Sequence, residues 1–589
     1  MDMFPGFSSL TWTPVDPMVP ASIPAKVLFG AVGSGTPSRN YAKDSETAFV
    51  AGGETFHGEP LVQDFTKVTW VRRASIIWTK MSLVRNLEQD FCAAILLLIW
   101  LFAHEYVRCK SRIPGFKGPF GLPILGSLRD IQRGNAPWIY RQWSHKYGAV
   151  YQVQLGNIPM LIINTADAAK AILTGNSHAT ISRPEFYTFH KIVSDTSATT
   201  IGTSPYSASL KTRRKTLATA LNRRAVSSYS NHIKTETLLF LREALKNGKA
   251  GQTSIDPGPL FLRMNVSLGF TLHWGTRLHK KGDMFHEITQ VEEAISNFRS
   301  LTSNTQDYVP LLRLLPFNRT SALAREMGAR RKKYTTVLDR ELDIQIAGET
   351  NEPCVRANAK LDPDSNLTAL ELESLNATIT AAGLDTMQAT VLWGIAVLCM
   401  RTDLQEKVFQ AIIERYAESD LLDDVPEGQD VAYLSAFIKE LLRCYPATRL
   451  SLPRTALRDF VYDGKVVPKD TVIVLNAWAC NNDPEIWSDH DVFRLERWLE
   501  HPDAPTFTFG LGSRMCIGSH LAVRELYVLF LRILKFFELE AGGPMDIDPI
   551  TGVANTAATV SGPKPLQVKF VPRNKEDLEV ALNAVELSQ

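Results

Sequence analysis

The pattern of apolar and polar positions predicts a mostly helical body with a small sheet from residue 113 onward. Helical spacing dominates from about 211 to 400. The run 150–155 (VYQVQL) alternates between apolar and polar positions, which is typical of a strand with one buried face. Further short runs, rich in branched apolar residues, predict strands over 160–164, 472–475 and 566–571.

The apolar run 91–103 (FCAAILLLIWLFA) stands apart from this body. As a helix it would span roughly 20 Å, against about 30 Å for the hydrocarbon core of a bilayer. Trp100 and Tyr106 suit the membrane interface, so we predict a short membrane anchor. A core helix and the apolar part of a signal peptide are the alternatives. The residues after the run favour a body that faces the cytosol, because they include Arg108, Lys110, Arg112 and Lys117.

The sequence predicts four parts. Residues 1–80 show no sustained period and are expected to be disordered, or an extension upstream of a true start at Met81. Residues 81–112 hold the anchor and its basic stop, 113–126 form a Pro- and Gly-rich linker, and 127–589 form one catalytic domain. The cytosolic orientation depends on a start near Met81, because the anchor is preceded by Arg72, Arg73, Lys80 and Arg85.

Composition and charge exclude several classes of protein. The chain has 589 residues, 45% of them hydrophobic and 21% charged, which is ordinary for a globular protein. A net charge of +2 offers no electrostatic footprint for nucleic acid. The seven cysteines are scattered and never spaced C-x-x-C, which argues against a disulfide framework or a cysteine zinc site and favours a reducing, cytosol-facing compartment.

The segment 509–518 (FGLGSRMCIG) carries the most specific chemical signal. Gly510 and Gly512 permit a tight turn before Cys516, and helical spacing resumes after the segment. A thiol at a helix N-terminus with Arg514 nearby is expected to have its thiolate form favoured. A buried cysteine beside a Gly-rich turn is the alternative. The complete spacing F-x-x-G-x-R-x-C-x-G, however, resembles the haem-binding loop of the cytochrome P450 family.

This resemblance covers about 113–572 and implies the cytochrome P450 fold: one mostly helical catalytic domain with a minor sheet, behind a membrane anchor. It implies haem b as cofactor, with electrons supplied from NADPH by a reductase. Carried over to this sequence, it makes Cys516 the axial thiolate ligand of the iron. Arg514 would pair with a haem propionate, and Phe509 would shield the sulfur from water.

Glu440 and Arg443 stand three residues apart in FIKELLRCYP, so their side chains lie on one helix face. Alone, such a pair is common on exposed helices. The pair is followed by FRLERW and then by the cysteine loop, and this order resembles the family's E-x-x-R motif and its later Arg-bearing motif. The resemblance implies that Glu440, Arg443 and Arg497 form a buried charged network that supports the haem loop. Leu495 departs from a Pro that is frequent there.

The segment AAGLDTM places Asp385 and Thr386 within a long apolar helical stretch, 376–400. A membrane span is one interpretation, but the apolar part is short and a buried core helix fits better. Thr386 is positioned to hydrogen-bond the Ala382 carbonyl and loosen the helix. The pattern resembles the family's oxygen-binding helix, which implies that Asp385 and Thr386 relay protons. Met387 departs from a frequent second hydroxyl residue, so the relay would be shorter.

The resemblance also assigns arginines outside the loop. The helix containing KTRRK would offer Arg214 to a haem propionate, although Leu210 stands at a usually aromatic position and leaves Arg213 as an alternative. Arg454, after Pro453, would be another propionate partner. Arg449 and Ser451 would line the substrate pocket, and Arg449 would meet a substrate carboxylate.

Within the family, the segments GTSPYSASLKTRRK, RLSLPRTA and NAWACNNDPEIW are similar to those of fungal arylacetate hydroxylases of the phenylacetate type. The resemblance implies a membrane monooxygenase of the endoplasmic reticulum that inserts one oxygen atom into a small aromatic or arylalkyl substrate. We expect a role in fungal secondary-metabolite biosynthesis. The alternatives are phenylacetate-type catabolism, oxidative coupling or ring closure, and a reductase-independent isomerase.

Overall fold

The structure, a computed structural model, describes residues 88–104, 106–107, 113–278, 282–362, 365–416, 421 and 427–586, together with Trp78 and Lys80. The prediction for residues 1–80 therefore lies almost wholly outside the described residues. The chain divides into two units, 1–85 and 86–589. In the second unit, residues 88–104 are helical and leave large apolar side chains such as Leu96 and Ile99 exposed.

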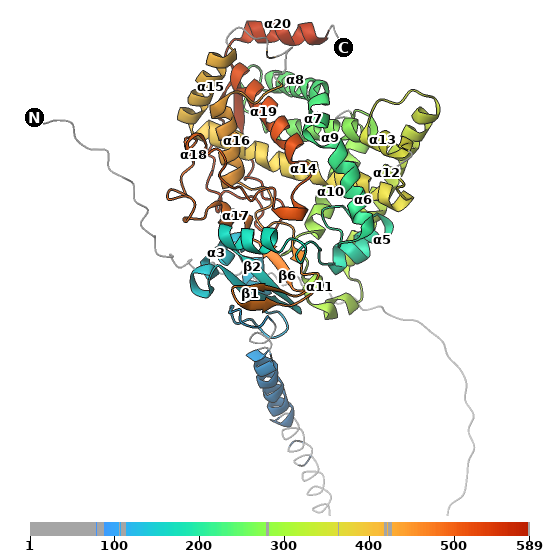
Figure 1. Cartoon of the computed structure of the whole chain (residues 1–589), viewed down its shortest axis with the longest axis vertical. Helices are drawn as coiled ribbons and strands as arrows, with labels where there is room; N and C mark the ends of the chain where they lie inside the picture. Colours follow the sequence, from blue (N-terminus) through green and yellow to red (C-terminus); the bar gives the residue numbers. More distant parts are fainter. Residues whose placement is uncertain are drawn as a thin grey trace, which may run out of the picture. The chain divides into compact units, whose positions relative to one another are not determined.

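Helices dominate the body, as the periodicity predicts (Figure 1). The earlier helices are α2 (Leu128–Arg133), α3 (Ala136–Tyr147), α4 (Ala166–Ala169), α5 (Ser194–Thr196), α6 (Ala208–Ala220), α7 (Arg223–Ser228), α8 (Ser230–Asn247), α9 (Gly258–Trp274), α10 (Asp283–Phe298), α11 (Thr305–Tyr308) and α12 (Arg319–Ala347). The later ones are α13 (Val355–Leu361), α14 (Ala369–Met400), α15 (Thr402–Tyr416), α16 (Ala432–Cys444), α17 (Ala477–Asn481), α18 (Arg497–Glu500), α19 (Ser519–Phe536) and α20 (Lys575–Glu586). Short π or 3-10 segments are η1 (Lys170–Gly175), η2 (Tyr187–Val193), η3 (Pro310–Leu314) and η4 (Gly512–Arg514).

The sheets are small, and each predicted strand is found. The largest has the order β1-β2-β6-β3, with β2 and β6 parallel and the other neighbours antiparallel. Figure 1 shows β1, β2 and β6 together at one end of the body. Two further pairs are β4 with β5 and β7 with β8. The strands are β1 (Val150–Leu155), β2 (Ile158–Ile163), β3 (Arg454–Thr455), β4 (Phe460–Tyr462), β5 (Lys465–Val467), β6 (Val472–Leu475), β7 (Phe537–Ala541) and β8 (Val568–Pro572).

Helix α14 is the central element of the core. It starts at a capping box in which Thr368 and Glu371 exchange hydrogen bonds, and it packs against helices α6, α9, α10, α16 and α19. Among the described residues it is the one helix long and apolar enough to cross a membrane, but 67% of its most apolar window is buried. The prediction of a buried core helix is therefore confirmed. Close packing requires Gly394, because a Cβ there would lie 2.3 Å from the Phe530 ring of α19.

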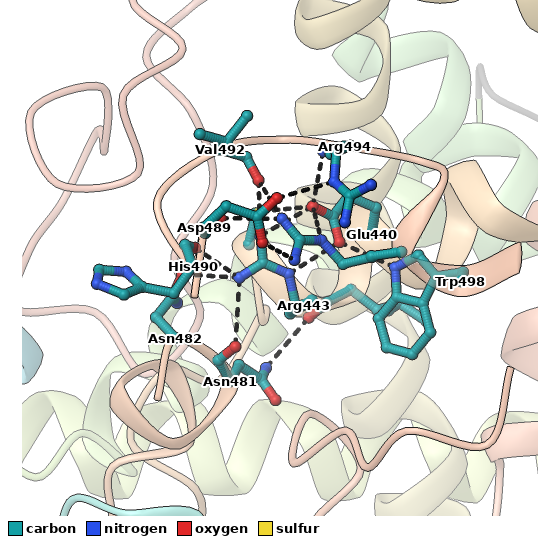
Figure 2. A network of polar contacts seen from close by, with 12 residues as sticks. Glu440, Arg443, Asn481, Asn482, Asp489, His490, Val492, Arg494 and Trp498 are labelled. Atoms are coloured by element: carbon teal, nitrogen blue, oxygen red, sulfur yellow. Dashed lines mark hydrogen bonds and ion pairs between the residues drawn. The ribbon is translucent and has the colours of Figure 1, made fainter. Parts of the chain in front are cut away.

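A buried ionic network joins the end of α16 to α18 and the segment before it (Figure 2). The Arg443 guanidinium donates two hydrogen bonds of 2.8 Å to Glu440, and Arg497 Nε donates a third of 3.0 Å. Trp498 Nε1 donates a fourth, of 2.9 Å, to the same carboxylate. All three charged residues are fully buried. The other N–H groups of these two guanidinium groups donate to Asp489 and to backbone carbonyls, so the buried charges are compensated and hydrogen-bonded.

This network continues to the cysteine loop through Asn481. Arg443 Nη1 donates to the Asn481 carbonyl at 3.3 Å, and the Asn481 side chain accepts from Phe507 N at 2.7 Å. Thr508 Oγ1 donates to the Leu442 carbonyl of α16 at 2.5 Å. The chain is thus fixed by hydrogen bonds immediately before Phe509, where the loop begins.

We expect Glu440→Ala to destabilise the protein by about 3–5 kcal/mol, because it leaves two buried guanidinium groups without their carboxylate. Unfolding midpoints from circular dichroism, and haem content after expression, measure the effect. Arg494→Ala is the matched control. The Arg494 backbone N–H donates to Glu440, but its side chain forms partly exposed pairs with Asp489 and Glu500. Its loss should cost about 0–1 kcal/mol. Equal stability of the two variants would contradict the assigned role of the network.

Candidate functional site

The loop from Phe509 to Gly518 is a tight turn that ends where α19 begins. Gly510 and Gly512 have φ of 71° and 57°, the left-handed region that favours glycine. Gly512 also lies close to the Leu173 carbonyl, which a Cβ would approach to 2.5 Å. The loop closes through Cys516 N, which donates to the Phe509 carbonyl at 2.9 Å. This geometry places the Cys516 side chain at the wall of a cavity.

The cavity has a volume of about 360 Å³ and lies between the cysteine loop, α9 and α14. Cys516, Phe509 and Gly518 line it on the loop side, and Thr386 and Met387 line it from α14. Apolar side chains make up much of the remaining wall: Leu217, Leu268, Leu272, Ile379, Leu475 and Leu526. One cavity is therefore lined by both Cys516 and the helix segment that the sequence associates with oxygen chemistry.

The electrostatic setting of Cys516 differs from the expectation. Its side chain is exposed to the cavity, but the surrounding protein buries the thiol enough to raise its pKa. The backbone N–H of Gly518, the Arg214 guanidinium and the backbone N–H of Ser519 all act in the opposite direction, but they do not outweigh burial. The helix N-terminus contributes as predicted, whereas the nearby cation is Arg214 rather than Arg514. A metal cation that coordinated the sulfur would supply the stabilisation that the thiolate still needs.

Four arginines gather at the cavity without acidic partners. Arg183, Arg214, Arg454 and Arg514 all line it. In the described part of the chain, their side-chain hydrogen bonds go to backbone carbonyls, such as Arg214 to Met515 at 3.1 Å and Arg454 to Leu511. Burial and the neighbouring guanidinium groups lower the pKa of Arg514 to about 9 and that of Arg454 to about 10. Such a cluster favours an anionic group, and two haem propionates satisfy that requirement.

Arg183 belongs to this cluster, although no motif in the sequence marks it. Its Nε donates to the Gly202 carbonyl at 2.9 Å, and its Nη1 donates to the carbonyls of Leu452 and Pro453. Burial, then the charges of Arg514, Arg454 and Arg214, hold its pKa well below the usual value. In the sequence, the only signal was an Arg–Pro pair in a loop after residue 180.

The structure separates Arg213 from Arg214. Arg214 lines the cavity, whereas Arg213 turns away and donates to the hydroxyls of Ser374 and Ser204. Leu210, at the position where an aromatic residue is usual, is buried in an apolar cluster with Leu217 and Leu375.

Within α14, the two predicted relay residues face different surroundings. Thr386 lines the cavity, and its Oγ1 donates to the Ala382 carbonyl at 2.8 Å, which confirms the predicted bond. Asp385 is not among the cavity-lining residues. Burial raises its pKa, and the Ser296 hydroxyl and the Arg299 charge oppose that rise. The carboxylate therefore lies toward the end of α10.

The two predicted pocket residues also differ. Ser451 lines the large cavity. Arg449 does not; it lines a neighbouring cavity of about 30 Å³. Its Nε donates to Ser561 Oγ at 2.9 Å and its Nη1 to the Pro549 carbonyl at 3.3 Å. Burial lowers its pKa to about 10. The structure thus ties Arg449 to the C-terminal segment rather than exposing it to the large cavity.

Comparison with known proteins agrees with this geometry. The cytochrome P450 family model matches residues 116–570. A 3-hydroxyphenylacetate 6-hydroxylase of Emericella nidulans is 50% identical over 488 residues, which cover 82% of this chain and 94% of that protein. A phenylacetate 2-hydroxylase of the same organism is 35% identical, covering 83% of this chain and 96% of its own length. A cytochrome P450 monooxygenase of Mycosarcoma maydis is 36% identical over 83% of this chain and 94% of that protein. The chain, with its cysteine loop and buried Glu–Arg network, therefore belongs to the cytochrome P450 family of haem-thiolate monooxygenases.

Proposed function

We propose that this cytochrome P450 hydroxylates an arylacetate. The observation that carries the proposal is the 50% identity, over most of both chains, to a protein named 3-hydroxyphenylacetate 6-hydroxylase. The mostly apolar cavity suits the aromatic body of such a substrate. The identity to two proteins named as phenylacetate-type hydroxylases, 50% and 35%, favours arylacetate chemistry over the biosynthetic role expected from the sequence.

In this proposal Cys516 ligates haem iron, and Arg183, Arg214, Arg454 and Arg514 pair with the propionates. Bound haem would supply an iron centre that activates O2 with electrons passed from NADPH by a reductase. Phe509, which lines the same cavity, would shield the sulfur from water. Thr386 holds a hydroxyl at the cavity wall, and Asp385 is the adjacent carboxyl group, whose pKa is raised by burial. In this proposal the two residues pass protons toward the cavity.

We further propose that the protein is bound to the membrane of the endoplasmic reticulum, with the catalytic domain facing the cytosol and its reductase. Two apolar surfaces support membrane binding. One is the helix over 88–104, whose apolar side chains are exposed. The other lies between α11 and α12, where Leu311, Leu314, Leu315 and Phe317 are more than half exposed.

Turnover with NADPH and reductase tests the activity. We expect phenylacetate or a hydroxyphenylacetate to shift the ferric haem spectrum toward high spin and to gain one oxygen atom from labelled O2. A shift only with larger aromatics, such as tryptophan derivatives, would indicate a biosynthetic role instead. A product that carries no added oxygen would indicate coupling or ring closure. Product formed without NADPH would indicate an isomerase.

We expect Cys516→Ser to abolish the thiolate-type absorption of the reduced, carbon monoxide-bound protein.

Arg183→Gln should keep the thiolate-type spectrum but lower haem retention during dialysis, because it removes one positive charge from the arginine cluster that would pair with the propionates. Lys191→Gln is the surface control, because Lys191 forms an exposed pair with Glu185. Full haem retention in Arg183→Gln would show that Arg183 is not part of the haem site.

The orientation is tested at Asn366, the exposed member of four N-x-S/T sequons. Asn265 and Asn376 are buried, and the Asn318 side chain caps α12. The absence of a glycan on these three asparagines would therefore say little about the orientation. We expect endoglycosidase treatment of microsomes to leave the full chain unchanged in mass. A tag that carries a sequon, added ahead of the N-terminus, is the positive control, because that end of the chain lies in the lumen in this topology. A glycan on Asn366 would reverse the orientation.

A further inference from the structure

Arg299 is a further cation at the cavity. It belongs neither to the haem-side cluster, which consists of Arg183, Arg214, Arg454 and Arg514, nor to the buried network around Glu440. It is the C-cap residue of α10, a position where a cation meets the negative end of the helix dipole. It lines both the large cavity and the small one beside Arg449. Leu452 and Thr559 are the other residues that line both spaces, so Arg299 lies at their boundary.

The Arg299 guanidinium has no fixed acceptor. No hydrogen bond or ion pair joins its side chain to another residue in the described ranges, and its Nε is buried without a partner. This differs from the four haem-side arginines, each of which donates to at least one carbonyl. Arg299 is half-buried, and a buried guanidinium N–H without an acceptor, such as its Nε, is costly. Burial accordingly lowers the pKa of Arg299, while the charge of Asp385 opposes that shift.

The nearby carboxylates are already committed or turned elsewhere. Glu292 pairs with Arg331, which donates to both of its oxygens, and also accepts from Tyr334. Asp385 is close enough to influence Arg299 but forms no ion pair with it and is not a cavity-lining residue. The side of Arg299 that faces the cavity is therefore available to an anion that enters the cavity.

The cavity suits a carboxylate attached to an apolar body. A guanidinium matches a carboxylate in a two-pronged geometry. Beyond Arg299 the wall carries aliphatic side chains, among them Leu268, Ile379 and Met387, which suit an apolar body. Arg299 and Thr386 of α14 line the same cavity, so an acid held by Arg299 would extend along the α14 wall.

We propose that Arg299 binds the carboxylate of the substrate and thereby selects arylalkanoic acids over neutral aromatics. The class of acid rests on the proposed function. The sequence suggested Arg449 for this role, but the Arg449 guanidinium is held by Ser561 and Pro549 outside the large cavity. Arg299 is a specificity residue in this proposal and takes no part in the oxygen chemistry.

The test is a spectral titration of the ferric holoenzyme with phenylacetate and with its neutral analogue 2-phenylethanol. We expect Arg299→Gln to weaken phenylacetate binding by about 10- to 100-fold, because a charge-assisted pair is lost, and to leave 2-phenylethanol affinity unchanged. Arg299→Lys should restore part of the loss. Arg330→Gln is the matched control: Arg330 binds Glu287 of the same α10, away from the cavity. The carbon monoxide spectrum verifies that each variant is folded.

Each remaining outcome decides the proposal. Unchanged phenylacetate affinity in Arg299→Gln would overturn it, and so would an equal loss for acid and alcohol, which indicates a structural role. If the wild type does not bind arylacetates but binds larger aromatic acids, the proposed function is wrong. The same variants, titrated with those acids, then test Arg299 separately. If the wild type binds no carboxylate at all, both proposals are overturned.

Discussion

The architecture of the site depends on one buried carboxylate. Glu440 accepts hydrogen bonds from two guanidinium groups, an indole and a backbone N–H, all far from water. An ion in such a place is tolerable only when its partners are held in position, so the surrounding segments have little freedom. Through Asn481 this rigidity reaches the residues just before Phe509. The position of the thiol is therefore set by a network that never touches the substrate.

The sequence revealed those parts of the site that are contiguous in the chain. The spacing around Cys516 falls within ten residues, and Glu440 and Arg443 are one helical turn apart. Each pattern therefore carries its own geometry. The long apolar stretch of α14 and the alternation in β1 were equally readable, because burial imposes a period on a single element.

The parts that could not be predicted depend on contacts between distant segments. Arg183 reaches the haem-side cluster from a loop more than 300 residues before Arg514. Arg299 stands at the end of a helix whose contact with α14 is a tertiary feature. The motif around Asp385 and Thr386 names two neighbours, but helical geometry turns adjacent side chains about 100° apart, and only Thr386 lines the cavity. Arg449 precedes a cavity-lining segment, but its own side chain donates a hydrogen bond to Ser561.

The cluster of Arg183, Arg214, Arg454 and Arg514 has a consequence for the protein before it binds haem. Four like charges whose partners among the described residues are backbone carbonyls repel one another, and the chain must bear this cost until a dianionic cofactor binds. Cofactor binding and folding are then thermodynamically linked, because a group that binds only the native state stabilises it by mass action. Newly made chains in a haem-poor cell would spend more time partly open and within reach of proteases. The amount of enzyme would therefore follow haem supply even at constant synthesis.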